Sequence, residues 1–240
     1  MTVLLEAQGL SKAFGGLKAL EGVSLAVTQG QILGVIGPNG AGKTTLFSCL
    51  SGFHRADAGS ITLEGRRIES MPPHRICGFG LARTFQLARP FQGMSVLENV
   101  MVAGMSRYPK VDDAREKAHA VLDRVGIVHL TSRDASGLSL ADLRAMEVAR
   151  ALATEPKVLL LDEMLAGLTP VEADRMHERF LQLKADGLGL VVIEHSVPSV
   201  TRLCDQVVVL NFGEVLATGT AAEVLNNPDV QEAYLGKRNG

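Results

Sequence analysis

Residues Gln31–Thr45 read QILGVIGPNGAGKTT, and this stretch decides the fold. Its first part, Gln31–Ile36, is a short apolar run typical of a strand that is covered on both faces of a sheet. The run leads into Gly37-Pro38-Asn39-Gly40-Ala41-Gly42-Lys43-Thr44, which fits the pattern G-x-x-x-x-G-K-[ST] in full. A helix from Thr44 to about Leu50, with Gly52 as its C-cap, is predicted to follow. A strand, a glycine-rich loop and a helix in this order are the setting of a phosphate-binding P-loop.

The spacing of this loop has a physical basis. Glycines lack Cβ atoms, so successive backbone N–H groups can point at phosphate oxygens, and the new helix adds the positive end of its dipole. We expect Lys43 to contact the β- and γ-phosphates and the Thr44 hydroxyl to bind Mg²⁺, with Thr45 among the nucleotide contacts. The alternative is a glycine-rich turn with an incidental lysine, and the flanking strand and helix disfavour it.

Composition and charge narrow the class of protein. The chain has 240 residues, of which 46% are hydrophobic and 21% charged, and this length favours one large domain or a domain with a subdomain. Because the formal net charge is only −2, no broad basic field exists for a nucleic-acid partner. Cys49, Cys77 and Cys204 are far apart and lack metal-ligand spacing, as in reduced cytosolic proteins. We expect neither an export signal nor a membrane-spanning segment.

Other apolar runs of strand length occur at Val158–Leu161, Leu190–Ile193 and Val207–Leu210, with helical patterns between them. Apolar residues from Ala145 to Leu152 recur at helical spacing, and this helix is expected to end near Pro156. Helices that alternate with buried strands predict an α/β architecture.

The middle of the chain has a different pattern. No strand-like run occurs from Ser95 to about Val128, whereas apolar residues mark a helical face there, so we predict an all-helical subdomain at about 88–153 inserted in the α/β core. Hairpins are predicted at Gly59–Gly65 and around Asn211–Gly213. Thr220 and Glu223 form a capping box that opens a last helix, which is expected to end near Pro228.

Two acids follow the apolar run Val158–Leu161 directly. A buried strand that ends in Asp162-Glu163 places both carboxylates at the carboxyl edge of the sheet, where nucleotides bind in open α/β folds. Asp162 can bind Mg²⁺, and Glu163 can orient or deprotonate an attacking water. Without a P-loop, two solvated acids after a strand would be an equally good reading.

The order of these motifs resembles that of ATP-binding-cassette (ABC) transporter ATPases. The matching segments span almost the whole chain: the P-loop, Phe85-Gln86, Leu161–Glu163, Ala166–Pro170 and Ile193–His195. More narrowly, ARTFQ at Ala82–Gln86, MSVLENVMVA at Met94–Ala103 and AYLG at Ala233–Gly236 are similar to the ATPase subunits of bacterial branched-chain amino acid importers. The resemblance implies a P-loop α/β core, the inserted helical subdomain and a small N-terminal antiparallel β region in a single ABC ATPase domain, 1–240.

The resemblance also implies roles for single residues. Phe14 corresponds to the aromatic residue that stacks on adenine, although a half-buried core phenylalanine is the alternative. Gln86 matches the glutamine that reaches Mg²⁺ and the attacking water, and that links the catalytic site to the helical subdomain. His195 matches the histidine that contacts the γ-phosphate. Without the motif order, Gln86 would be a surface residue and His195 a histidine at a strand end.

One segment departs from the family pattern. The family signature is Leu-Ser-x-Gly-Gln, whereas Leu138-Ser139 is followed here by Leu140-Ala141-Asp142. In family dimers the Ser139 position and nearby backbone N–H groups meet the ATP held by the opposite subunit. The Ala141 Cβ would obstruct that approach and the Asp142 charge would oppose it. Asp142 would be harmless if it turned outward at a helix N-terminus. Lesser departures are Met164 for a proline and Thr169 for an acid or asparagine.

The resemblance implies a subunit that binds and hydrolyses ATP with Mg²⁺ and couples this to import of branched-chain or related amino acids. Its expected partners are membrane permease subunits, a second ABC ATPase subunit in a heterodimer rather than a homodimer, and indirectly a solute-binding protein, but no nucleic acid. Its expected place is the cytoplasmic face of the inner membrane, as a peripheral protein.

Two alternatives stay open. One is an ABC ATPase of DNA repair or translation, which the absence of a second cassette, heptads and a basic arm disfavours. The other is a weakly hydrolysing partner subunit, which the altered signature favours and the presence of Glu163 and His195 opposes.

Overall fold

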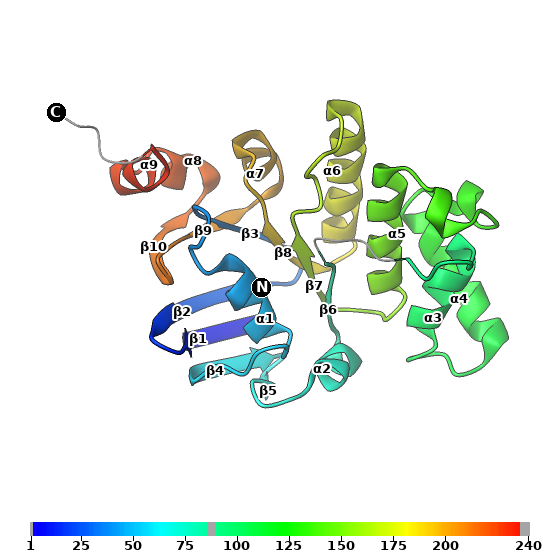
Figure 1. The fold of residues 1–240 in the computed structure, drawn as a ribbon, viewed down its shortest axis with the longest axis horizontal. Coiled ribbons are helices and arrows are strands. Elements are labelled where there is room, and N and C mark those ends of the chain that lie inside the picture. Colours follow the sequence, from blue (N-terminus) through cyan, green and yellow to red (C-terminus); the bar gives the residue numbers. More distant parts are fainter. Residues whose placement is uncertain (1, 86–89, 236–240) are drawn as a thin grey trace.

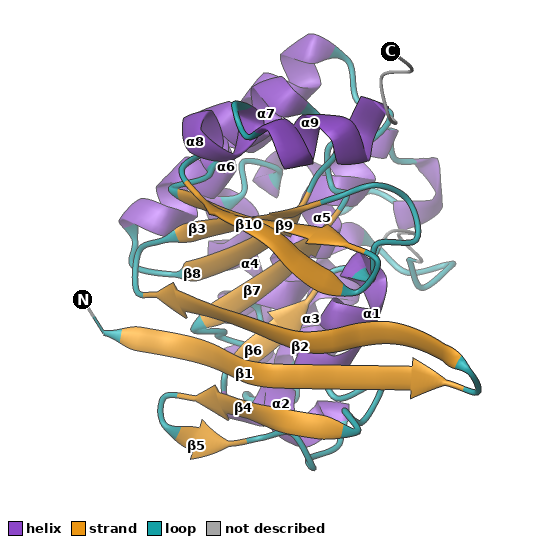
Figure 2. Cartoon of the chain, turned by 90° about the vertical axis from the view of Figure 1, so that its left-hand side faces the viewer, coloured by secondary structure: helices purple, strands orange, loops and turns teal. Residues whose placement is uncertain are grey.

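The structure, a computed structural model, describes residues 2–85 and 90–235. Within these residues the strands form two sheets. The first is antiparallel with the order β2-β1-β4-β5. It consists of β1 (Val3–Phe14), β2 (Leu17–Thr28), β4 (Ala58–Leu63) and β5 (Arg66–Arg67). This is the antiparallel β region that the resemblance implied. Figure 2 shows β1 and β2 running alongside each other, with β4 and β5 below them.

The second sheet carries the P-loop and has the order β10-β9-β3-β8-β7-β6. Its strands are β3 (Ile32–Ile36), β6 (Leu81–Arg83), β7 (Val158–Asp162), β8 (Gly189–Ile193), β9 (Gln206–Asn211) and β10 (Glu214–Gly219). All neighbours pair in parallel except the β9–β10 hairpin. The predicted buried strands and both predicted hairpins are therefore confirmed. Because β3, β7 and β8 are adjacent and parallel, their carboxyl ends meet at one edge.

Helices cover this sheet on both faces and extend beyond its β6 edge (Figure 1). They are α1 (Lys43–Leu50), α2 (Pro73–Phe79), α3 (Val96–Gly104), α4 (Val111–Arg124), α5 (Leu140–Leu152), α6 (Pro170–Ala185), α7 (Val197–Leu203), α8 (Ala221–Leu225) and α9 (Pro228–Leu235). Short 3₁₀ turns lie at Val128–Leu130 and Ala135–Gly137. Helices α3, α4 and α5 pack together in the chain between β6 and β7. Among the described residues, no helix combines the length and apolar character needed to cross a bilayer.

Two large apolar clusters hold these layers together. One lies between the two sheets around α1, where Phe47 is fully buried with residues of β1 and β2. The other joins the second sheet to α5 and α6 and extends to α3 and α4, with Phe180 at its centre. The strand–loop–helix unit of the P-loop is thus packed from both sides, which fixes the loop against the sheet edge.

The sequence missed one helix near the C-terminus. The Thr220–Glu223 capping box opens α8, which ends at Leu225 ahead of Pro228 as predicted, but α8 is not the last helix, because Pro228 begins α9. Proline is well suited to the first turn of a helix, because its missing N–H would have no partner there and its φ is already helical. At the end of α1 the C-cap is Ser51, and Gly52 follows with a φ of +76°.

Candidate functional site

The P-loop bends sharply between β3 and α1, and two of its glycines are required by close backbone approach. A Cβ on Gly37 would lie 2.1 Å from the carbonyl oxygen of Leu210, and one on Gly42 would lie 2.5 Å from that of Ala19. Both residues also have positive φ, 150° and 104°. The loop therefore stays tight against β9 and β2, while Asn39 and Gly40 at its crest are exposed.

Lys43, the first residue of α1, points back into this loop. Its Nζ donates hydrogen bonds to the carbonyl oxygens of Gly37 (2.7 Å) and Pro38 (2.9 Å). Burial lowers the pKa of the Lys43 ammonium, and the charges of Glu163 and Asp162 raise it in part. The two acids predicted from the β7 pattern are therefore close enough to act on the P-loop lysine. Beside Lys43, Thr44 is exposed and Thr45 is half-buried.

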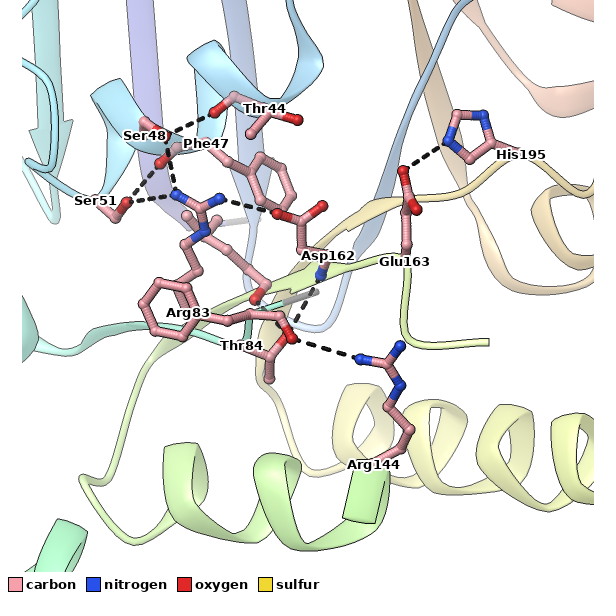
Figure 3. A network of polar contacts seen from close by, with 12 residues as sticks. Thr44, Phe47, Ser48, Ser51, Arg83, Thr84, Arg144, Asp162, Glu163 and His195 are labelled. Carbon is pink, nitrogen blue, oxygen red and sulfur yellow. Dashed lines mark hydrogen bonds and ion pairs between the residues drawn. The ribbon is translucent and has the colours of Figure 1, made fainter. Parts of the chain in front are cut away.

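Asp162 ends β7 and its side chain is only 6% exposed. Its Oδ2 pairs with Nη2 of Arg83, a residue of the neighbouring strand β6, at 2.9 Å. Figure 3 shows this pair beneath α1. Sequence reasoning missed the contact, because Arg83 and Asp162 are 79 positions apart and meet only through the β6–β7 pairing.

Glu163 and His195, to which the resemblance gives separate catalytic roles, lie next to each other. The Nε2 atom of His195 is 2.8 Å from Oε1 of Glu163, and Figure 3 shows the two side chains facing each other from the ends of β7 and β8. Glu163 has a φ of +49°, a left-handed conformation that is unusual for any residue other than glycine. Such strain collects at functional sites.

The backbone behind this pair is held by Glu194, another residue that the sequence did not single out. Its buried carboxylate accepts a hydrogen bond from the Leu165 N–H at 3.3 Å, which joins the segment after β7 to the segment after β8. Burial raises the pKa of Glu194 to about 7, with a smaller contribution from the charge of Glu163, and hydrogen bonds from the N–H groups of Leu165 and His195 oppose the shift. The signal available in the sequence was its position directly before His195.

The altered signature segment forms the start of α5. Ser139 is the N-cap: its Oγ accepts a hydrogen bond from the Asp142 N–H (3.2 Å) and donates one to Oδ2 of Asp142 (2.8 Å). The charge of Asp142 also acts on Arg179 of α6 in the same chain. Asp142 is thus a capping residue with a basic neighbour, and it engages the hydroxyl that the family uses for ATP. The lesser departure Thr169 is likewise an N-cap, in a capping box with Glu172.

The remaining predicted positions have different outcomes. Phe14 ends β1, is 44% exposed, and makes an edge-on contact with the His54 ring at 5.2 Å between centroids. Gln86 lies outside the described residues. At the far end of the chain, α9 lies close to the P-loop, since Glu232 and Ala233 line one cavity together with Pro38 and Asn39. Burial raises the pKa of the Tyr234 hydroxyl in the same helix.

The predicted magnesium site can be tested against the donors present. Thr44 offers a hydroxyl and Asp162 a carboxylate, both hard oxygen ligands of the kind that Mg²⁺ prefers. Within the described part of the chain, no cluster of three or more His, Cys, Asp or Glu side chains could hold a metal alone. This donor set fits a cation that shares its ligands with a bound polyphosphate.

A phosphate-binding turn alone could only hold a nucleotide. Here the Glu163 carboxylate, paired with His195, is close enough to the lysine of that turn for its charge to act on it, so the site has the groups needed to activate water next to a bound polyphosphate. On a parallel sheet with an added antiparallel sheet and helical insertion, this chemistry defines an ATPase of the ATP-binding-cassette class.

The family comparisons agree. Residues 20–166 match the family described as ABC transporter, and residues 214–238 match that described as branched-chain amino acid ATP-binding cassette transporter. The chain belongs to the ABC transporter family as an ATP-binding subunit that hydrolyses ATP.

Curated relatives match it over nearly their whole length. A probable branched-chain amino acid transport ATP-binding protein, LivG, of Archaeoglobus fulgidus is 40% identical over 248 residues, which cover 98% of this chain and 96% of the relative. The high-affinity branched-chain amino acid transport ATP-binding protein BraF of Pseudomonas aeruginosa is 39% identical, with 98% of each chain covered. A crystal structure of the ADP conformation of an ATP-binding cassette of an ABC transporter has a TM-score of 0.91 and 34% identity, with 99% of this chain and 100% of that chain covered.

Proposed function

We propose that this chain is the ATP-binding and hydrolysing subunit of an importer of branched-chain or related amino acids, acting through separate membrane permease subunits. The observation that carries the proposal is the Glu163–His195 pair beside the P-loop lysine, in a chain whose relatives are named as branched-chain amino acid transport proteins. The match of residues 214–238 to the branched-chain amino acid transporter family supports the solute class.

The site residues divide the chemistry between them. When ATP binds, the Lys43 ammonium exchanges the carbonyls of Gly37 and Pro38 for the β- and γ-phosphates. Glu163 accepts the proton of the attacking water, and His195 fixes the carboxylate and meets the γ-phosphate. Thr44 and Asp162 would hold Mg²⁺, which would supply positive charge to offset the negative charge that develops on the phosphates. The exposed ring of Phe14 is the stacking surface for adenine.

A groove beside the site is suited to a permease segment. It has a volume of about 720 Å³ and runs between α2 and α5. Its lining includes Thr44, Phe53, His74, Arg83, Phe85 and Glu147. Since Thr44 and Arg83 belong to both the groove and the nucleotide site, a cytoplasmic segment of a permease seated there would touch the catalytic elements directly. We place the chain at the cytoplasmic face of the membrane, held by this contact.

A second ATPase subunit with an intact signature is the proposed dimer partner. The Ser139 hydroxyl is hydrogen-bonded to Asp142, so this chain presents a poor signature to a partner's ATP. Its own P-loop, Asp162, Glu163 and His195 remain complete. A heterodimer therefore has one competent site, on this chain, whereas a homodimer has two impaired ones.

Reconstitution tests the proposed function. The chain is purified from native membranes together with its partner subunits, placed in liposomes and assayed for ATP-dependent uptake of labelled leucine, isoleucine and valine. A complex that carries Glu163→Gln is the control, since it should bind ATP and not transport. Uptake of another solute class, with none of these three transported, would contradict the proposal.

A further inference from the structure

The proposed mechanism gives no role to Arg83. Its Nη2 atom lies 2.9 Å from Oδ2 of Asp162, the predicted metal ligand. Both side chains are nearly inaccessible, at 8% and 6% exposure. A buried ion pair stabilises a fold only weakly, because both charges lose their hydration. The pair therefore calls for an explanation beyond stability.

The surroundings of Arg83 hold its guanidinium in one place. Nη1 reaches the hydroxyls of Ser48 (3.1 Å) and Ser51 (3.5 Å) on α1. Those hydroxyls donate their own protons to the carbonyls of Thr44 and Phe47, so they can only accept from Arg83. Figure 3 shows the guanidinium between α1 and Asp162.

Aromatic rings cover the guanidinium, with Phe47 at 5.6 Å and Phe85 at 5.4 Å from its central carbon. The Arg83 Nε atom is buried and has no hydrogen-bond partner among the residues that the structure describes. The guanidinium is thus held by one carboxylate, two serine hydroxyls and two ring faces, and within residues 2–85 and 90–235 Asp162 is its one anionic partner.

We propose that Arg83 is a built-in counter-ion for Asp162, which takes the place of a metal cation while no nucleotide is bound and so weakens the affinity of the empty site for free divalent cations. The inference rests on the assignment of Asp162 as a metal ligand in the proposed function. A second cation near Arg83 is repelled at short range in a poorly hydrated site. The phosphates of ATP supply the negative charge that offsets this repulsion, so a divalent cation binds with the nucleotide rather than before it.

The nucleotide-free chain is titrated with Mn²⁺, which carboxylate and hydroxyl ligands accept as they accept Mg²⁺, and free Mn²⁺ is counted by electron paramagnetic resonance. Arg83→Gln should bind Mn²⁺ at least about tenfold more tightly than the parent chain. Arg124→Gln, which removes another arginine–aspartate pair far from the site, should leave the affinity unchanged. No gain in Arg83→Gln, or a loss, would overturn the inference.

Thermal unfolding gives an independent readout. Removing Arg83 leaves a buried carboxylate without a counter-ion, so the melting temperature of Arg83→Gln should fall and Mg²⁺ should restore it, whereas the parent should barely respond. A fall that Mg²⁺ does not reverse would show a merely structural role.

Arg83→Lys keeps the charge but shortens the reach, and should keep the weak metal affinity of the parent. A tenfold gain in Arg83→Lys would also overturn the inference, whether or not Arg83→Gln folds.

The double variant Arg83→Gln with Asp162→Asn separates this inference from the function it rests on. If Asp162 is the ligand, the gained Mn²⁺ binding disappears in the double variant. If the gain persists there, another group holds the cation, and the assignment of Asp162 fails together with the counter-ion role. If Asp162→Asn weakens Mg-ATP binding but Arg83→Gln gains no affinity, only the counter-ion role fails.

Discussion

Relief of the contact between Ser139 and Asp142 should activate the isolated chain. The perturbation is Ala141→Gly with Asp142→Gln, which restores backbone access at the start of α5 and removes a carboxylate that holds the Ser139 hydroxyl at 2.8 Å. For Ser139 to meet a partner's γ-phosphate, this hydrogen bond to a charged group must break.

A shielded hydrogen bond to a charged group stabilises a structure by about 1.5–3 kcal/mol, and an exposed one by less. For the exposed Ser139–Asp142 bond we take a cost of breaking of about 1–1.5 kcal/mol. That cost corresponds to roughly tenfold in rate. The repulsion between the Asp142 carboxylate and the phosphates adds to it. The double variant should therefore hydrolyse ATP at least about tenfold faster than the parent as a homodimer.

The assay is steady-state phosphate release by the purified chain across ATP and protein concentrations, with dimerisation followed by light scattering. Asp134→Asn is the matched control, because Asp134 makes a similar contact with Ser136 just ahead of the signature and should not change the rate. Robust, cooperative hydrolysis by the parent alone, with no gain in the double variant, would refute the asymmetric dimer.

The other predictions concern the nucleotide site and its support. Lys43→Ala should abolish nucleotide binding or nearly so, because the charge-assisted contacts to the β- and γ-phosphates are lost; fluorescent ATP binding as tight as that of the parent would remove the P-loop assignment. Glu163→Gln should keep ATP binding but slow hydrolysis by about 10²–10⁴-fold through loss of the base, and unchanged turnover in single-turnover assays would exclude Glu163. Glu194 has a pKa raised from 4.5 to about 7 by burial, so its contribution is fully favourable below pH 4.5 and about 3 kcal/mol of stability is lost as pH rises through 7. The melting temperature of Glu194→Gln should therefore be close to that of the parent at pH 5 and higher than that of the parent at pH 8. If the melting temperatures of the two proteins had the same pH dependence, the Glu194 carboxyl would not titrate in this range.

Much of the site was predictable from the sequence because its residues follow their strands and loops directly. Lys43 is fixed by the glycine spacing, and Asp162 and Glu163 by the apolar run that precedes them. The Ser139–Asp142 contact also has a local pattern, a serine N-cap with an acid three positions on, although its effect on the signature needed the geometry.

Contacts across the sheet were not predictable in this way. The Arg83–Asp162 pair depends on β6 lying beside β7, and the three residues of β6 are too few to show a strand pattern. Strands β1 and β2 have register shifts that break a regular alternation of apolar residues. Helix α9 was missed because Pro228 was interpreted only as the end of α8, although proline also begins helices, and only the packing of α9 shows that it does so here.

The left-handed backbone at Glu163 sets stability and activity against each other at a single position. A residue with a side chain in this conformation costs of order 1–3 kcal/mol, and glycine is the residue for which that conformation is free of steric cost. Selection for thermal stability alone would therefore install glycine beside Asp162 and lose the carboxylate that faces His195. A stabilised variant of this enzyme found by heat selection without an activity screen should be inspected first at position 163.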